Sequence, residues 1–457
     1  RCGFFYSSRI GNTNLFNALI RKKNMNQDKE YILKIARDKN VRFVRLWFSD
    51  ILGNLKSFAI NIDELEDALA EGVRFDGSTL SGVTRTEEHE LLAVPDPETF
   101  QILPWRPKED SVARMFCDIY KTDMTPYEGD SRFVLKRALK KAADKGYIFY
   151  TGPEIEFFFL KNSTKPEFID RGGYFDLTPL DTASDYRRQT VLTLQQMGID
   201  IISSHHEGAF SQHEIDLRHT DALATADNIL TFRIVAKEIA QMNNIFASFM
   251  PKPFSDQNGS GLHIHMSLFK NDKNIFFDKN KDYLLSDTAK HFIAGVLKHT
   301  NEFFAVTNQW INSYKRFHAE FEAPTFVSWG TGSNAMLVRV PECRLDKPNS
   351  MRIEIRNPDP SCNPYLALAV ILNAGLKGIE NNYEFEKPSD MSSKPKDGQK
   401  LPETLSEALV HFSNSELIDE TLGSYIKEIF IENKRIEIDA FNRHVSDFEI
   451  SNYFPIL

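Results

Sequence analysis

Residues 152–160 alternate acidic and apolar positions in a way that predicts a β-strand. The alternation places Glu154 and Glu156 on one face of this strand, and Ile155 and Phe157 on the other. A buried face cannot hold two ionised carboxylates unless cations or basic side chains compensate for them, because desolvation and mutual repulsion both oppose ionisation. A half-exposed strand with a solvated acidic face is the alternative, and this segment alone does not decide between the two.

Four further segments place polar side chains together on one face or close to a predicted strand. Each such histidine or glutamate, taken alone, is more often a satisfied core residue or a surface charge. Together they predict an oxygen-rich ligand set that suits Mg²⁺ or Mn²⁺, whereas a thiolate zinc site is not supported. Carboxylates with arginines also suit phosphoryl transfer, in which guanidinium groups neutralise developing charge. The residues concerned are His263 and His265 in 260–267, Arg352, Glu354 and Arg356 in 351–356, Glu207 in 205–207, and Glu214 in 212–216.

Hydrophobic periodicity elsewhere predicts a mixture of helices and strands. Predicted strands cover 41–48 and 245–250, and the first of them leads through a turn at 50–54 into another strand. Thr404 and Glu407 have the spacing of a capping box that opens the C-terminal helices. The predicted helices cover 28–38, 63–71, 131–146, 220–243, 286–305 and 363–380.

Composition narrows the class of protein. Apolar and charged fractions of 41% and 26% are those of a soluble globular protein, and no stretch approaches the roughly 18 apolar residues of a membrane helix. Residues 1–24 hold five basic residues and no acid, which leaves 50 basic against 64 acidic residues, or −14, for 25–457. Nucleic acid is therefore not an expected partner. Four cysteines without CxxC pairing (Cys2, Cys117, Cys343 and Cys362) suit a reducing compartment, which predicts a cytoplasmic protein.

From Met25 to Leu457, the chain resembles the class I glutamine synthetase family. This family joins ammonia to the γ-carboxylate of glutamate, and it uses ATP to form γ-glutamyl phosphate. The matching motifs lie in the family's order at 75–78 (FDGS), 152–158 (GPEIEFF), 205–207 (HHE), 212–214 (QHE), 252–253 (KP), 258–265 (NGSGLHIH), 312–316 (NSYKR), 322–324 (EAP), 352–360 (RIEIRNPDP) and 363–366 (NPYL).

The resemblance implies an α+β fold with an N-terminal β-grasp domain over 25–125 and a catalytic, barrel-like α/β domain over 126–457. Residues 1–24 contain no initiator Met and are interpreted as an extension: a transit peptide, a translated upstream region or a sequence fragment. The family assembles as two stacked hexameric rings, so a homo-dodecamer with active sites at subunit interfaces is expected. Glutamate, ammonia and ATP are the expected partners, without a membrane or nucleic acid.

The resemblance also assigns roles to individual residues. Two ions, Mg²⁺ or Mn²⁺, would be held by separate sets: Glu156, Glu207 and Glu214 for one, and Glu154, His263 and Glu354 for the other. Glutamate would be bound by Asn258, Gly259, Gly261, Arg316 and Arg356, with guanidinium groups suited to carboxylates. The phosphates of ATP would meet His265, Ser267 and Arg339. The catalytic residues would be Arg316, Arg339, the flap residue Glu322, which helps to deprotonate ammonium, and Asp76, which the neighbouring subunit contributes to the ammonium site.

Several positions depart from the family pattern. Asn334 stands where the family has an arginine that stabilises the transferring phosphate, and the residues Ala319 and Glu320 replace a Pro-Gly pair before the flap glutamate. Ile202 occupies a position that is commonly acidic, and Glu90 replaces a second aspartate of the ammonium site. These departures leave two alternatives open: a γ-glutamyl amide ligase that uses an amine, or a metal- and nucleotide-binding oligomer with little or no catalysis.

Overall fold

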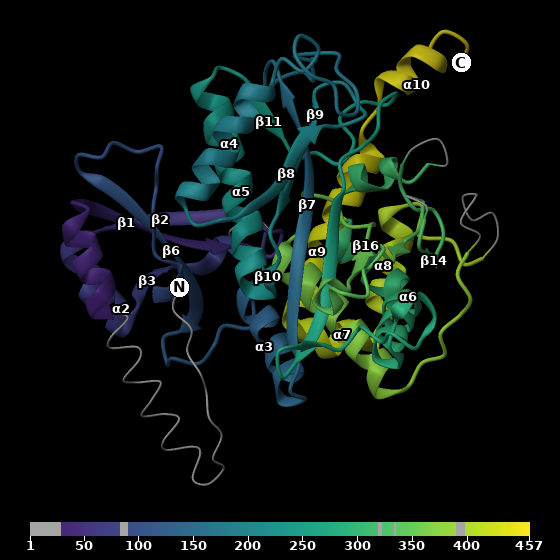
Figure 1. Cartoon of the computed structure of the whole chain (residues 1–457). Helices are drawn as coiled ribbons and strands as arrows, with labels where there is room; N and C mark the ends of the chain where they lie inside the picture. The colour runs from purple at the N-terminus through teal and green to yellow at the C-terminus, as the bar shows by residue number, and fades with distance from the viewer. Residues whose placement is uncertain (1–28, 83–89, 319–321, 333–334, 390–397) are drawn as a thin grey trace. The chain divides into compact units, whose positions relative to one another are not determined.

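The computed structural model describes residues 29–82, 90–318, 322–332, 335–389 and 398–457 (Figure 1). The chain divides into two compact units. Among the described residues, the first comprises 29–48, 56–75 and 90–125, and the second comprises 49–55, 76–82 and the described part of 126–457. Within the described ranges, no helix is both long enough and apolar enough to cross a membrane.

The first unit contains a six-stranded sheet. Its strands lie in the order β2 (Leu55–Asn61), β1 (Val41–Ser49), β6 (Ser111–Lys121), β4 (Glu90–Pro95) and β3 (Val73–Asp76), and β5 (Gln101–Ile102) pairs with β6. The central pair β1 and β6 is parallel, whereas β4 runs antiparallel to β6. Val44, Leu46 and Met115 are fully buried, and the rings of Trp47 and Phe116 meet edge to face at 5.6 Å. A helix over 29–38 and α2 (Leu65–Glu71) complete this unit.

The second unit is built on a curled sheet of ten strands. The main path runs β14 (Trp329–Gly330), β15 (Val338–Arg339), β16 (Ile353–Ile355), β12 (Leu262–Lys270), β7 (Ile148–Leu160), β9 (Gln212–Leu217) and β8 (Ile201–His206). The short strands β10 (Thr220–Asp221) and β11 (Phe246–Ser248) pair with β7, and β13 (Lys273–Asn274) pairs with β12. β7 therefore lies inside the sheet, with an antiparallel neighbour on each side.

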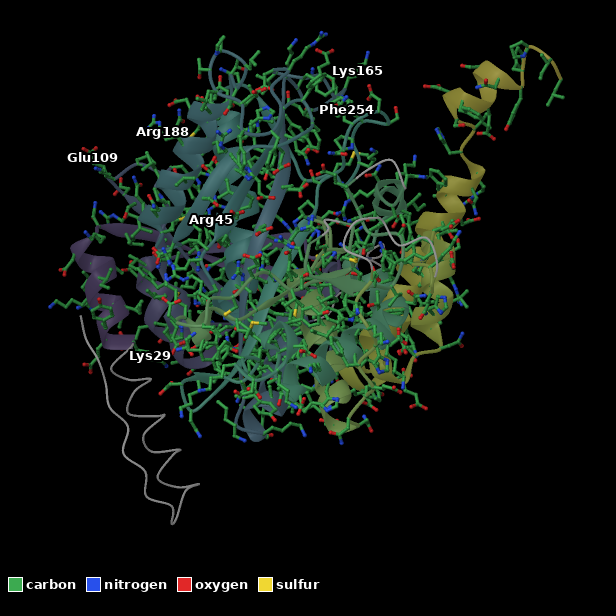
Figure 2. The ribbon with its side chains drawn as sticks, turned by 45° about the vertical axis from the view of Figure 1, so that its right-hand side comes forward. Lys29, Arg45, Glu109, Lys165, Arg188 and Phe254 are labelled. Carbon is green, nitrogen blue, oxygen red and sulfur yellow. The ribbon has the colours of Figure 1, made fainter. Side chains whose placement is uncertain are left out.

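Helices pack against this sheet and against one another (Figures 1 and 2). Charged side chains such as Lys165 and Arg188 point outward from the second unit. In contrast, α7 is buried around almost its whole circumference, as its continuous apolar sequence requires. The helices are α3 (Ser131–Asp144), α4 (Ser184–Gln196), α5 (Ala222–Met242), α6 (Asp287–Thr307), α7 (Pro364–Glu380), α8 (Leu405–Ser413), α9 (Glu416–Arg443) and α10 (Asp447–Asn452).

Glycine allows α6 and α7 to pack closely. A Cβ placed on Gly295 would lie 2.2 Å from the carbonyl oxygen of Ala374 and 2.8 Å from the backbone nitrogen of Gly378. Backbone atoms cannot move out of the way as a flexible side chain can. The contact between the two helices therefore depends on glycine at this position.

The cap signals in the sequence correspond to observed helix ends. The side chain of Asp130 accepts from the backbone N–H of Arg132 at the start of α3, and that of Asn363 caps α7. Thr404 caps α8 as predicted, because its side chain accepts from the backbone N–H of Glu407. The carboxylate of Glu407 accepts from the N–H of Glu403, instead of the N–H of Thr404 that a capping box uses. The predicted strands over 245–250 and 351–356 are shorter in the structure, and α4 was not predicted.

Candidate active site

The strand β7 presents its acidic face to a cavity and its apolar face to the core. Ile155 and Phe157 are fully buried, and the ring of Phe157 lies 5.5 Å from that of Phe232 on α5. Glu154 and Glu156 both line a cavity of about 360 Å³. The predicted alternation is therefore confirmed, and the acidic pair faces an enclosed site rather than an open surface.

Strand register gathers the other polar residues around this pair. Glu154 lies opposite Asp216 on β9 and opposite His263 on β12, and Glu156 lies opposite Glu214. Directly opposite side chains in a sheet are close neighbours, so the register alone concentrates carboxylates here. The cavity is lined by Glu154, Glu156, Tyr174, His205, Glu207, Gly208, Gln212, Glu214, Asp216, Asn258, Gly259, His263, Arg316, Glu322, Arg339 and Arg356.

Two histidines of β12 compensate for the charge of Glu154. Its Oε1 lies 2.6 Å from Nε2 of His265, and its Oε2 lies 3.3 Å from Nδ1 of His263. Burial opposes ionisation, but the hydrogen bonds to both histidines outweigh it and hold the pKa of Glu154 below its ordinary value. Glu154 is therefore an ionised group in this site.

Two arginines compensate for the buried charge of Glu354 on β16. Its Oε2 accepts from Nε of Arg339, and its Oε1 accepts from Nη1 of Arg356. Burial again opposes ionisation, but the charge of Arg356 contributes to a lowered pKa of Glu354. Guanidinium groups and a carboxylate thus meet at the edge of the cavity, where they can also contact an anionic ligand.

Glu207 and Glu214 lack such compensation. The nearest basic group is His205, whose nitrogens lie 3.6 Å from Oε1 of Glu207 and 3.5 Å from Oε1 of Glu214. Burial, followed by the negative charge of Glu156, raises the pKa of Glu207 to about 8 and that of Glu214 to about 12. Glu156 itself accepts from the side-chain amide of Gln212, at 2.9 Å. This side of the cavity therefore has an excess of carboxylates that a bound cation would relieve.

Groups of potential metal ligands occur at several points of the cavity. Within each group, one ligand atom from every member lies within 4.8 Å of the others. Five of the six predicted ligands occur in these groups and Glu156 does not, while His205 joins Glu207 and Glu214, and His265 joins Glu154 and Glu354. The groups are His205, Glu207 and Glu214; Glu154, Glu214 and His263; and Glu154, His265 and Glu354.

Four of the five predicted glutamate-binding residues line this cavity, and the fifth, Gly261, donates its backbone N–H to Oε2 of Glu156 at 2.9 Å. Arg316, which ends the 3₁₀ helix η5 (Ile311–Arg316), is 2% exposed, and its Nη1 donates to the carbonyl of Asn357 at 3.0 Å. A Cβ on Gly259 would lie 2.5 Å from Cγ of Arg316 and 2.5 Å from the carbonyl oxygen of Pro251. The backbone therefore approaches the guanidinium wall as closely as only glycine permits. Asn258 and Arg356 line the same cavity.

A second cavity, of about 370 Å³, adjoins the first. Glu154 and Asp216 line both. The predicted phosphate residues His265 and Ser267 line this second cavity, while Arg339 lines the first. Its other walls include aromatic, apolar and basic side chains that suit a nucleotide: Tyr150, Ile202, Leu217, Arg218, His219, Phe269 and Arg352.

Some predicted residues are not brought to these cavities. Asp76 caps a 3₁₀ turn by accepting from the N–H of Ser78 at 3.0 Å, and it does not line either cavity in the described part of the chain. Glu90 belongs to the first unit, where it pairs with Arg74 at 3.0 Å. Glu322, in contrast to these two residues, does line the first cavity. Ala319, Glu320 and Asn334 lie outside the described residues.

Sequence reasoning did not identify all of the lining residues. Asp216 follows Glu214 by two positions on the same strand, so the alternation that was applied to residues 154–156 would have found it. His205 stands two residues before Glu207 in the same motif. Tyr174 belongs to a segment without regular periodicity, so no sequence pattern would have identified it.

A buried polar network supports Glu207 from behind the cavity. Nδ1 of His206 lies 2.7 Å from the carbonyl oxygen of Glu207, and its Nε2 lies 3.0 Å from Oδ1 of Asp170. The ring of His213 packs edge to face against that of His206, with 5.0 Å between centroids, and its Nδ1 lies 2.8 Å from Nη1 of Arg187. The network fixes the backbone at Glu207 and thereby the direction from which its carboxylate enters the cavity.

Two family models identify the class of protein to which this fold and this carboxylate- and arginine-rich cavity belong. The family model described as the catalytic domain of glutamine synthetase matches residues 128–453, and that described as its β-grasp domain matches residues 40–122. The chain belongs to the glutamine synthetase family, and its activity is that of a glutamate–ammonia ligase.

Curated relatives match over nearly their whole length. The chain is 47% identical to the glutamine synthetase of Mycolicibacterium smegmatis over 446 residues, which cover 94% of this chain and 100% of the relative. It is 44% identical to that of Methanosarcina mazei, over 94% of this chain and 98% of the relative.

Solved structures show the same fold. One titled as a GmaS complex with ADP superposes with a TM-score of 0.84 at 28% identity, and covers 93% of this chain and 99% of its own. Plasmodium falciparum glutamine synthetase superposes with a TM-score of 0.85 at 24% identity, over 94% of this chain and 98% of its own. The predicted β-grasp and catalytic domains are therefore confirmed as the fold of the chain.

Proposed function

We propose that the cavity around Glu154 and Glu156 performs the amidation of glutamate, and that its carboxylates hold two divalent cations, Mg²⁺ or Mn²⁺. The observation that carries this proposal is the pair Glu207 and Glu214, which is buried beside a third carboxylate without a guanidinium or ammonium partner among the described residues. Oxygen ligands in this number fit a hard cation. The donor set therefore suits the ions that the family uses.

Two sets of ligands in this cavity would each hold one cation. Glu156, Glu207 and Glu214 would hold one ion, and Glu154, His263 and Glu354 the other, with small side-chain rotations from the arrangement described above. When bound, the ions would supply charge neutralisation for the phosphate oxygens. The histidine contacts that lower the pKa of Glu154 support its role as an anionic ligand.

ATP would occupy the second cavity. Its aromatic and apolar walls suit a base, and His265, Ser267 and Arg352 would face the phosphates. The relative whose structural title includes ADP supports a nucleotide site in this fold. Because Glu154 lines both cavities, the γ-phosphate would enter the first cavity at the carboxylate cluster.

Glutamate would bind at the opposite wall. Arg316 and Arg356 would receive its carboxylates, and Asn258, Gly259 and Gly261 would contact the rest of the substrate. A side chain at position 259 would clash with Arg316, so glycine keeps the backbone and the guanidinium group together at this wall.

The reaction then follows in two displacements. A γ-carboxylate oxygen of glutamate attacks the γ-phosphorus of ATP, the bond to the bridging oxygen breaks, and ADP leaves. Arg339 stabilises the charge on the transferring group. Glu322, together with Asp76 of a neighbouring subunit, takes up the proton that ammonium releases as it becomes ammonia. Ammonia then attacks the carbonyl carbon of the acyl phosphate, the bond to the phosphate oxygen breaks, and inorganic phosphate leaves as hydrogen phosphate with the proton that the attacking nitrogen loses. The role of Asp76 requires a ring assembly, which we propose to be a homo-dodecamer.

A coupled assay tests the function, and two variants test the ligand set. With ATP and Mg²⁺, phosphate release should require both glutamate and ammonia; release with methylamine but not ammonia would instead indicate a γ-glutamyl amide ligase. Glu214→Gln should lower Mn²⁺ affinity at least tenfold, by loss of an anionic ligand. Asp216→Asn, which alters a cavity carboxylate outside the proposed set, should retain Mn²⁺ binding. An equal loss of Mn²⁺ affinity in the two variants would contradict the assignment of Glu214 as a metal ligand.

A further inference from the structure

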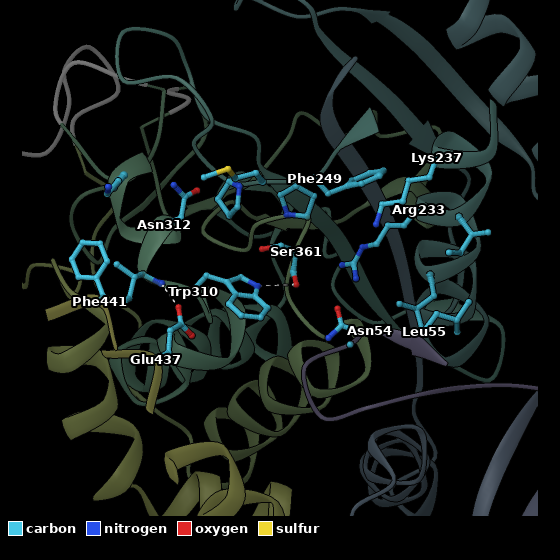
Figure 3. A pocket seen from close by; sticks show the side chains of 18 residues that line it. Asn54, Leu55, Arg233, Lys237, Phe249, Trp310, Asn312, Ser361, Glu437 and Phe441 are labelled. Carbon is cyan, nitrogen blue, oxygen red and sulfur yellow. Dashed lines mark hydrogen bonds between the residues drawn. The ribbon is translucent and has the colours of Figure 1, made fainter. Parts of the chain in front are cut away.

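A separate cavity of about 770 Å³ lies in the second unit, and it shares no lining residue with the two cavities described above. Helix α5, the 3₁₀ helix η5 and the end of α9 contribute to its walls, together with residues 53–55 and 249–251 (Figure 3). Its aromatic residues are Phe249, Trp310 and Phe441, and its basic residues are Arg233, Lys237 and Lys315. This combination of aromatic and basic side chains distinguishes the cavity from the catalytic cavity, which is lined by many carboxylates.

Arg233 is the most informative residue of this cavity. Its side chain is 8% exposed, and its Nη2 donates to the carbonyl oxygen of Cys362 at 2.7 Å. Its Nε is buried and has no hydrogen-bond partner among the described residues. A buried donor on a charged group is energetically costly when it has no partner. The cavity therefore lacks a hydrogen-bond acceptor for Nε of Arg233.

Lys237 lies one helical turn after Arg233, and both side chains extend from α5 into the cavity (Figure 3). The ammonium group lies 5.8 Å from the ring centroid of Phe249, and it makes no ion pair within the described chain. Burial, followed by the positive charge of Arg233, lowers the pKa of Lys237. The two cations therefore repel each other across a space that an anion would stabilise.

Glu437, the acidic residue that lines the cavity, does not neutralise these two cations. Glu437 accepts from the backbone N–H of Ile311 at 3.0 Å and from Nζ of Lys434 at 2.8 Å, so both of its oxygens are already engaged. Lys315 adds a third cation, with Nζ 5.7 Å from the ring centroid of Phe441. The cavity thus keeps an excess of positive charge beside apolar walls.

We propose that this cavity binds a small organic carboxylate with an apolar or aromatic body. The carboxylate would accept from Nε of Arg233 and from the ammonium of Lys237, and the body would pack between Phe249 and Trp310. Such a site combines apolar walls with a few convergent polar groups, as small-molecule sites do. No lining residue is shared with the two other cavities, so this ligand would occupy a place distinct from the catalytic site.

Saturation-transfer NMR on the full-length protein, with 3-phenylpropionate as the probe, tests this site. Its uncharged analogue, 3-phenylpropanamide, has the same ring and length and measures the apolar contribution alone. We expect the carboxylate to bind at least tenfold more tightly than the amide. Lys237→Met should reduce carboxylate affinity at least tenfold, because methionine retains the apolar contact and removes the charge.

Two further variants keep the result interpretable. Lys315→Met should also weaken binding, by a smaller factor, whereas Lys279→Met, which removes an exposed lysine elsewhere in this unit, should leave it unchanged. Thermal unfolding of each variant identifies any loss of folding. Equal binding of the carboxylate and the amide, or carboxylate binding that persists unchanged in Lys237→Met, would overturn the proposal.

Discussion

Glu154 and His263 face each other across the pairing of β7 with β12, and Oε2 of the glutamate lies 3.3 Å from Nδ1 of the histidine. This contact helps to keep Glu154 ionised, whereas Glu207 and Glu214 in the same cavity have raised pKa values. The difference in the direction of the pKa shifts arises from the hydrogen-bond partners of these carboxylates and not from burial, since all three are largely withdrawn from solvent. One cavity therefore contains carboxylates that respond to pH in opposite ways.

The metal-free protein should lose stability as the pH rises from 7 to 8. The pKa of Glu207 is raised from 4.5 to about 8, so the folded state retains a proton that the unfolded state has already released. The folding penalty therefore grows above pH 4.5 and levels off near pH 8. Thermal unfolding in EDTA at pH 7 and pH 8 should show the decrease.

Matched measurements separate this effect from other titrations. Glu207→Gln cannot ionise at this position, so it should show a smaller decrease over the same pH interval. Saturating Mn²⁺ should stabilise the starting protein more at pH 8 than at pH 7, because the ion replaces a proton that is weakly held at the higher pH. A starting protein whose stability rises between pH 7 and 8 in EDTA would contradict the assigned direction.

His206→Phe should weaken Mn²⁺ binding by about 10- to 100-fold, the usual range for loss of a residue that supports a metal ligand. Phenylalanine keeps the ring shape and removes the hydrogen bonds to Asp170 and to the carbonyl of Glu207. Electron paramagnetic resonance of free Mn²⁺ measures the affinity, and the KM for glutamate should change much less. His411→Phe, on the exposed face of α8, provides the control; equal affinities in both variants would remove the supporting role from His206.

Gly259→Ala should raise the KM for glutamate by roughly tenfold or more, with a smaller effect on the KM for ATP. The added Cβ would lie 2.5 Å from both Cγ of Arg316 and the carbonyl oxygen of Pro251, so the guanidinium wall must move. Steady-state kinetics with each substrate varied separately measure the two constants. Gly173→Ala is the matched control, because its Cβ would meet only Asp176, at an ordinary 3.5 Å.

Gly295→Ala should destabilise the second unit by about 1–3 kcal/mol, the usual cost of overpacking a core. Its Cβ would meet backbone atoms of α7 at 2.2 and 2.8 Å, which cannot rotate away. Urea unfolding followed by the fluorescence of the buried Trp329 measures the change. If Gly295→Ala unfolded at the same urea concentration as Gly173→Ala, the close packing of α6 and α7 would not limit stability.

The sequence predicted which strand segments form the site, but it did not predict which of their side chains lie in contact. Two-residue alternation placed Glu154 and Glu156 on one face, because the strand's side-chain period leaves no other choice. The register that brings Asp216 opposite Glu154 depends on pairing between strands more than 50 residues apart in sequence, which periodicity does not reveal. For the same reason, the contact of His265 with Glu154 could not be derived from either segment alone.

Lys315 and Arg316 are consecutive residues of η5, yet the first lines the basic cavity and the second lines the catalytic cavity. Neighbouring side chains of a 3₁₀ helix point about 120° apart, so one short helix serves as a wall of both. A displacement of η5 would therefore change the walls of both cavities. If a ligand in the basic cavity displaces η5 and changes glutamate affinity by some factor, glutamate must change the affinity of that ligand by the same factor.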